Sequence, residues 1–176
     1  MKAATRVTAL AMLLALILPG TVLANLKSGE DKVLAEMRSA IPGDRLKNIE
    51  DLHAKWQQIQ AGRSKAYIID IRSQAEFDAG HIIGSSNIDS GHAYDLPKKI
   101  KDSKAEIWVF CRTKQRASYF TGLLYRYGYK NVYLAEGGIK AWAARGYPLG
   151  NKYLGEFVVT TYHKKLKEDF WSRENK

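Results

Sequence analysis

The cysteine at position 111 is the only one in the chain, and its surroundings suit a nucleophile. It follows the apolar run 107–110 and opens the basic segment Cys111-Arg112-Thr113-Lys114-Gln115-Arg116, after which the sequence has a helical pattern. A strand that leads through a short loop into a helix directs backbone N–H groups toward one point, which favours a thiolate and a bound anion. Isolated cysteines are more often buried and inert, but the flanking charges argue against that here. We predict that Cys111 is a catalytic nucleophile.

Positive charge is concentrated around this cysteine. The chain has a formal net charge of +10 at pH 7, and residues 111–149 contain seven basic residues but one acidic residue. Such a field raises the local concentration of small anions, whereas nucleic-acid binding needs a basic stripe with aromatic platforms. We therefore expect a small anionic substrate and no nucleic acid.

The sequence predicts neither a metal site nor a bound cofactor. A single cysteine offers no second thiolate, and no glycine-rich phosphate loop or dinucleotide fingerprint is present. The four histidines are not at ligand spacing: His53, His81, His92 and His163. We expect His81 to make structural hydrogen bonds and not to form a catalytic pair with Cys111.

Short apolar segments alternate with helical patterns along the chain. Strands are expected just before residue 49 and at 67–71, 86–88, 107–110 and 132–134, and helices at 25–43, 49–59, 73–80, 117–127 and 138–146. This alternation predicts a parallel α/β sheet with its site at the carboxyl ends of the strands. Cys111 lies at one such end. Asp70 and Arg72 lie at another, where we expect an ion pair that orders the loops of the site, with direct substrate contact by Arg72 as the alternative.

The two ends of the chain depart from this pattern. Residues 1–24 have a basic start, an apolar core and a small-residue exit, which is typical of a secretory signal cleaved after Ala24. The apolar core is too short to favour a stable transmembrane helix, so we expect a periplasmic or otherwise exported protein without stable membrane insertion. The remaining length fits one domain at 45–149, with a helical extension at 25–44 and a second extension at 150–176 that packs on the domain.

Three blocks of the sequence resemble the single-domain rhodaneses, a family of sulfurtransferases. The blocks are Ile69–Arg72 with Glu76-Phe77 and Gly80–Ile82, then Cys111–Arg116 with Ala117-Ser118, then Gly128–Pro148 with Gly137-Gly138 and Trp142. Their order makes the resemblance far more specific than any single block. It implies a central five-stranded parallel sheet flanked by helices, and a catalytic cysteine that carries a sulfane sulfur as a persulfide without another cofactor.

The resemblance also implies an activity. Cys111 would take sulfur from a small anionic donor such as thiosulfate and pass it to cyanide, a thiol or a protein acceptor. Lys114 stands where the family often has glycine, and its added charge favours thiosulfate as the donor. The resemblance assigns donor binding to the loop and a supporting role to one strand end: Arg112, Thr113, Lys114, Gln115 and Arg116, supported by Asp70 and Arg72.

Two other functions are alternatives. A non-catalytic rhodanese-fold sulfur carrier or binding module would hold the persulfide but turn over poorly without its partner. A cysteine phosphatase or arsenate reductase is the weaker alternative, because phosphatases that share this fold have a loop one residue longer than the stretch between Cys111 and Arg116.

Overall fold

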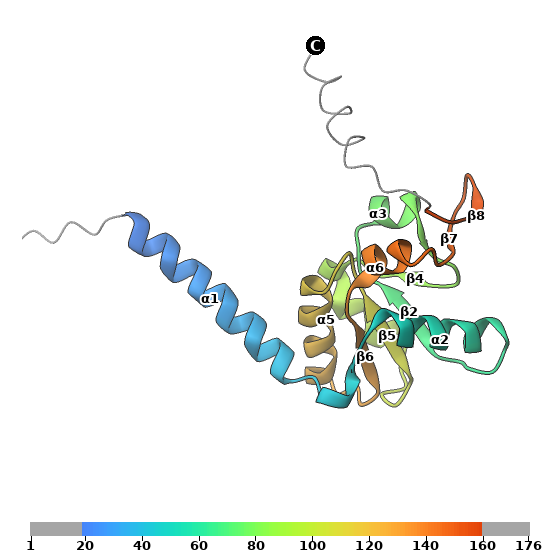
Figure 1. Ribbon diagram of the computed structural model, residues 1–176. Coiled ribbons are helices and arrows are strands. Elements are labelled where there is room, and N and C mark those ends of the chain that lie inside the picture. The colour runs from blue at the N-terminus through green and yellow to red at the C-terminus, as the bar shows by residue number, and fades with distance from the viewer. Residues whose placement is uncertain (1–18, 160–176) are drawn as a thin grey trace, which may run out of the picture. The chain divides into compact units, whose positions relative to one another are not determined.

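The computed structural model describes residues 19–159. Five strands form a sheet in the order β1-β6-β5-β2-β4, and all neighbouring pairs are parallel. This confirms the predicted five-stranded parallel sheet flanked by helices (Figure 1). The strands are β1 (Leu46–Lys47), β2 (Tyr67–Asp70), β4 (Ser86–Asn87), β5 (Ile107–Phe110) and β6 (Val132–Ala135).

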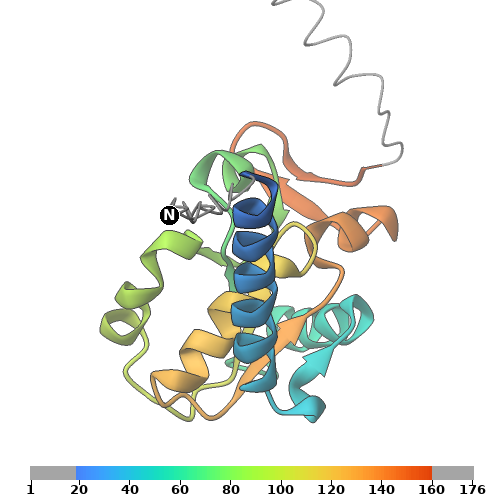
Figure 2. The ribbon, with the colours of Figure 1, turned by 90° about the vertical axis from the view of Figure 1, so that its left-hand side faces the viewer.

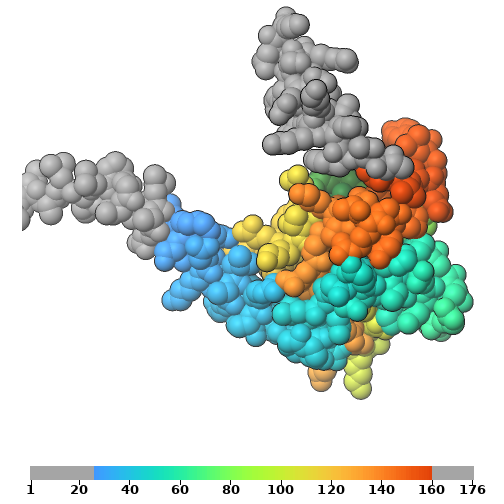
Figure 3. All heavy atoms as spheres, in the orientation of Figure 1, coloured from blue at the N-terminus to red at the C-terminus, as the bar shows by residue number. Residues whose placement is uncertain are grey.

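Alternating side chains of β5 divide the core into two clusters. Ile107 and Val109 pack in one cluster with residues of α5 (Gln115–Arg126), whereas Trp108 and Phe110 pack in the other with residues of α2 (Ile49–Gln60) and α6 (Gly138–Ala144). Successive side chains of a strand point to opposite faces of a sheet, so the two clusters lie on its two faces. In Figure 3, α6 and α2 lie beside each other on the face toward the viewer.

Short helices complete the cover of the α5 face. The helix η1 (Gly43–Arg45) precedes β1, and η2 (Ser90–Asp95) and α4 (Leu96–Lys99) follow β4. Figure 2 shows η2 and α4 on the same side as α5, and Leu96 packs in the α5-side cluster. No element was predicted for residues 90–99.

A second, antiparallel sheet was missed by the sequence analysis. It has the order β3-β7-β8 and contains β3 (His81–Ile82), β7 (Leu149–Asn151) and β8 (Gly155–Phe157). The strand at 132–134 is therefore not the last one of the chain. Strands of two or three residues are too short to show a two-residue hydrophobic period, which explains the error.

Local sequence accounts for where several helices begin. Asn48 caps α2 in a capping box with Asp51, and Ser73 caps α3 (Gln74–Ala79) in a capping box with Glu76. The second of these caps agrees with the prediction from sequence. Helix α5 begins at Gln115, two residues earlier than predicted, with Lys114 at its N-cap.

Helix α1 (Pro19–Ser39) precedes the sheet. It extends across two units of the chain, one ending at Lys32 and one beginning at Val33. The helix was expected to reach residue 43 but ends at Ser39, because Pro42 disfavours helical backbone at the residue before it. Within residues 19–159 no helix has both the length and the apolar character needed to span a membrane.

Most residues to which the predictions for the two chain ends refer are not described by the structure. Positions 1–18 of the expected signal and positions 160–176 of the expected C-terminal extension lie outside the described residues. Of that extension, Phe157 and Val159 pack against the core cluster on the α2 and α6 face.

Candidate functional site

Cys111 lies at the carboxyl edge of the parallel sheet. It directly follows β5, while Asp70 ends the neighbouring strand β2 in register with Phe110, and Glu136 follows β6 on the other side. The structure therefore brings three strand ends together around the cysteine. Helix α5 begins at Gln115, four residues after Cys111. The positive N-terminal end of its dipole favours negative charge nearby.

The Cys111 side chain is buried while the residues that follow it are exposed. Cys111 is 1% exposed and belongs to the α5-side core cluster, which continues the alternation of β5. The next four residues, Arg112 to Gln115, are exposed. The loop thus presents the cations of Arg112 and Lys114 to solvent directly after a buried thiol.

The start of α6 holds the backbone of this loop. The N–H of Ile139 donates to the carbonyl oxygen of Cys111 at 2.9 Å, and the N–H of Lys140 donates to that of Arg112 at 3.2 Å. Gly138 makes this approach possible, because a Cβ there would come within 2.3 Å of the Cys111 carbonyl oxygen. Its φ of 55° is also in the left-handed region that favours glycine.

Arg116 is bound to an acidic residue from a different part of the chain. Its Nη1 and Nη2 donate to the two carboxylate oxygens of Glu76 in α3, at 2.8 and 2.9 Å. Two parallel hydrogen bonds fix the plane of a guanidinium as well as its position. Arg116 was expected to contact the substrate, and in the structure two of its five N–H groups are taken by Glu76.

The contact between Arg116 and Glu76 shifts the pKa values of both side chains. Hydrogen bonds from Arg116 lower the pKa of the Glu76 carboxyl to about 2, against the opposing effect of burial. The pKa of Arg116 is raised, chiefly by its hydrogen bonds to Glu76 and to a smaller extent by the charges of Cys111 and Asp70. Arg116 is therefore within electrostatic range of the cysteine.

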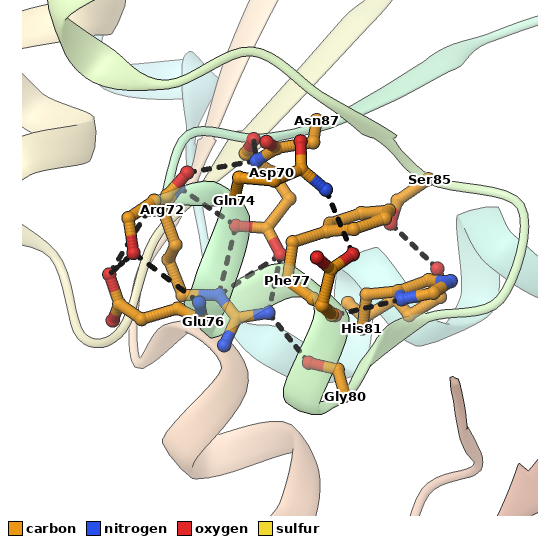
Figure 4. A network of polar contacts seen from close by, with 12 residues as sticks. Asp70, Arg72, Gln74, Glu76, Phe77, Gly80, His81, Ser85 and Asn87 are labelled. Atoms are coloured by element: carbon orange, nitrogen blue, oxygen red, sulfur yellow. Dashed lines mark hydrogen bonds and ion pairs between the residues drawn. The ribbon is translucent and has the colours of Figure 1, made fainter. Parts of the chain in front are cut away.

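Asp70 and Arg72 form the ion pair expected from the sequence. Both are buried, and the Arg72 guanidinium donates to the Asp70 carboxylate at 2.6 to 3.0 Å. Arg72 also donates to the carbonyl oxygen of Gly80, and the amide of Asn87 donates to the carbonyl oxygens of Asp70 and Arg72 (Figure 4). Arg72 is turned toward these partners, which ties the end of β2 to α3 and β4.

His81 packs at the end of α3. Its ring stacks on that of Phe77, with 3.8 Å between the centroids, and its Nδ1 lies 3.0 Å from the Phe77 carbonyl oxygen. These contacts agree with the expected structural role. Across residues 19–159, no three His, Cys, Asp or Glu side chains gather as a metal site would require.

Two contributions to the site were missed by the sequence analysis. Glu76 was recognised only as a capping residue, although it also belongs to the first of the rhodanese-like blocks, which was the available signal. Gly138 was quoted in the third block, but no sequence pattern indicated that it contacts the Cys111 loop.

The sequence is similar to a known family of domains and to proteins that contain it. The model of the family described as rhodanese-like domain matches residues 51–145. The uncharacterized protein YqhL of Bacillus subtilis is 29% identical over 89 residues, which are 51% of this chain and 70% of that protein. The tRNA uridine(34) hydroxylase of Streptococcus thermophilus is 31% identical over 97 residues, which cover 52% of this chain but only 30% of the hydroxylase.

The fold is also similar to that of a protein of known structure. A rhodanese-related protein from Thermoplasma volcanium is 28% identical, with a TM-score of 0.50, and the match covers 60% of this chain and 96% of that one. The family match at 51–145 begins within α2 and includes Cys111 and four strands of the parallel sheet, β2, β4, β5 and β6.

Proposed function

Because this chain belongs to the family of rhodanese-like domains, we propose that it is a sulfurtransferase that carries a sulfane sulfur as a persulfide on Cys111. The observation that carries the proposal is the position of Cys111 between the end of β5 and the start of α5, inside a loop with three basic residues. Four residues separate Cys111 from Arg116, which resembles the loop of the sulfurtransferases more than that of the phosphatases.

The first step would load the cysteine. The Cys111 thiolate attacks the outer sulfur of thiosulfate, a sulfur–sulfur bond forms, and the sulfur–sulfur bond of the donor breaks to release sulfite with its electron pair. A thiolate and a dianion repel each other, and the cations of Arg112 and Lys114 offset that repulsion. Arg116 contributes less, because its charge is paired with that of Glu76. The N-terminal end of α5 acts in the same direction.

The second step would return the free thiolate. A nucleophilic acceptor such as cyanide attacks the outer sulfur of the persulfide and leaves as thiocyanate, while the electron pair of the broken bond returns to Cys111. The covalent intermediate divides one transfer into two easier ones. In a cell, a thiol or an acceptor protein would take the place of cyanide. Neither step requires a bound cofactor, since the sulfur is carried by the chain.

Thiocyanate formation from thiosulfate and cyanide tests this function. We expect turnover by the full chain, one added sulfur atom in the intact mass after thiosulfate alone, and the loss of both in Cys111→Ser. An added sulfur without turnover would favour the carrier alternative, and neither signal in a folded protein would contradict the proposal. Turnover of a phosphate monoester or of arsenate that depends on Cys111 would favour the phosphatase or reductase alternative.

The role of the loop cations has a matched control. Lys114→Gln removes a basic side chain from the loop, whereas Lys130→Gln removes an equally exposed one beyond the opposite end of α5. We expect Lys114→Gln to raise the KM for thiosulfate about threefold to tenfold and Lys130→Gln to leave it unchanged. Equal effects of the two substitutions would mean that net charge, and not the loop, attracts the donor.

A further inference from the structure

Arg38 lies near the end of α1 and outside the family match at 51–145. It contacts Ser118 of α5 and Glu136 just before α6, and both segments hold the Cys111 loop. Its Nη1 donates to Ser118 Oγ at 3.3 Å, and its Nη2 pairs with Glu136 Oε1 at 2.6 Å. We propose that Arg38 is a positioning residue for the Cys111 loop. The inference rests on the proposed function of that loop.

Ser118 connects Arg38 to one side of the loop. Its N–H and its hydroxyl both donate to the carbonyl oxygen of Lys114, at 2.8 and 3.1 Å, and its hydroxyl oxygen accepts the hydrogen bond from Arg38. A hydroxyl that both donates and accepts has a fixed orientation. Ser118 is only 2% exposed, so Arg38 is its donor within the protein and not bulk water.

Glu136 connects Arg38 to the other side. It immediately precedes Gly137-Gly138, and the amides of Ile139 and Lys140 then bind the carbonyl oxygens of Cys111 and Arg112. Glu136 is also the one acidic residue in the basic stretch 111–149 of the sequence. The charge of Arg38 neutralises a carboxylate that would otherwise oppose an anionic donor at the loop.

The end of α1 is close enough to α5 to hold Arg38 in place. A Cβ at Gly122 would come within 2.2 Å of the Met37 carbonyl oxygen, so the close approach depends on that glycine. Ile41, which is 5% exposed, packs in the α5-side core cluster. Glu36 of α1 forms a second ion pair, with Arg126 at the end of α5 away from Cys111. This second pair is a natural control, because it links the helices without contacting the loop.

Hydrogen exchange at the amides of Ile139 and Lys140 tests the inference in the full chain. Arg38→Gln and Glu36→Gln each remove one ion pair made by the last turns of α1, so Glu36→Gln controls for a general loosening of this helix end. We expect exchange at both amides to be at least about threefold faster in Arg38→Gln and unchanged in Glu36→Gln. No change in Arg38→Gln, or the same change in both variants, would overturn the assignment.

The KM for thiosulfate adds a readout that a merely structural role would not move. In Arg38→Gln the unpaired Glu136 carboxylate repels the anionic donor, so KM is expected to rise about threefold. The double variant Arg38→Gln/Glu136→Gln removes both charges and is expected to restore KM. An unchanged KM in Arg38→Gln would contradict the neutralising role.

Arg38→Lys separates charge from geometry. Lysine retains the charge but lacks the planar fork that reaches Ser118 and Glu136 together, so the KM for thiosulfate should stay unchanged while amide exchange accelerates. The exchange experiment needs no sulfur donor. If the unsubstituted protein does not turn over thiosulfate, the proposed function fails while the exchange result still decides the role of Arg38.

Discussion

Arg116 and Glu76 are joined by two hydrogen bonds that connect the first turn of α5 to the first turn of α3. Glu76 also accepts the N–H of Ser73 in its capping box, so the end of β2, the start of α3 and the Cys111 loop share one carboxylate. An arginine held in this way keeps its charge near the loop in a fixed orientation.

Removal of the Glu76 carboxylate should impair the loop without removing any cation. We expect Glu76→Gln to lower kcat/KM for thiosulfate about tenfold, because Arg116 loses its fixed orientation. Glu50→Gln, which breaks the exposed ion pair of Glu50 with Arg145, is the control and should leave turnover unchanged. If both substitutions lower turnover equally, orientation of Arg116 is not the cause.

The same carboxylate makes stability depend on pH. Its pKa is about 2 in the folded chain against an ordinary value of 4.5, so the stabilisation is complete above about pH 4.5 and is lost as the pH falls toward 2. Because both partners are about one-third exposed, we expect a contribution of only about 0.5–1 kcal/mol. Urea unfolding of the unsubstituted protein and Glu76→Gln at several pH values measures it. A stability difference that persists undiminished near pH 2 would contradict this origin.

Gly138 should tolerate no side chain. Gly138→Ala would place a Cβ against the Cys111 carbonyl oxygen and strain a backbone with φ of 55°, at a cost of about 2–3 kcal/mol in the free energy of unfolding. Gly43→Ala is the control, since a Cβ there meets nothing within 4 Å. Denaturant titration of both variants checks the difference, and a Gly138→Ala protein as stable as Gly43→Ala would refute the close approach.

Removal of only one member of the Asp70–Arg72 pair should strongly destabilise the folded chain. Arg72→Ala leaves a fully buried Asp70 carboxylate without its partner, and we expect a loss of about 3–5 kcal/mol. Lys98→Ala removes one partner of the exposed Asp95–Lys98 pair and should leave stability nearly unchanged. Thermal and urea unfolding distinguish these outcomes, and a small effect of Arg72→Ala would show that Asp70 finds another donor or becomes protonated.

The sequence was sufficient to predict the parallel sheet and the position of Cys111 in it. The apolar run 107–110 coincides with β5, and the capping residues at Ser73 and Glu76 correctly mark the start of α3. These features depend on neighbouring residues, so their signals are local. The ion pair of Asp70 with Arg72 could also be predicted, because its members are two residues apart.

Contacts between distant parts of the chain could not be predicted in the same way. Glu76 and Arg116 are separated by 40 residues, and Arg38 and Glu136 by 98, so no periodic pattern relates them. The small sheet of β3, β7 and β8 was missed for a related reason, since its short strands are defined by their partners and not by their own sequences.

The contact at Gly138 bears on whether the site could be transferred to another protein. The Cys111–Arg116 hexapeptide owes its shape to amides at 139 and 140 and to a carboxylate at 76, none of which belongs to it. Grafted onto another scaffold by itself, the hexapeptide would carry its thiol and its charges but not their arrangement. The smallest transferable form of this site is therefore the stretch from β2 to α6 together with Arg38 of α1, and not the loop.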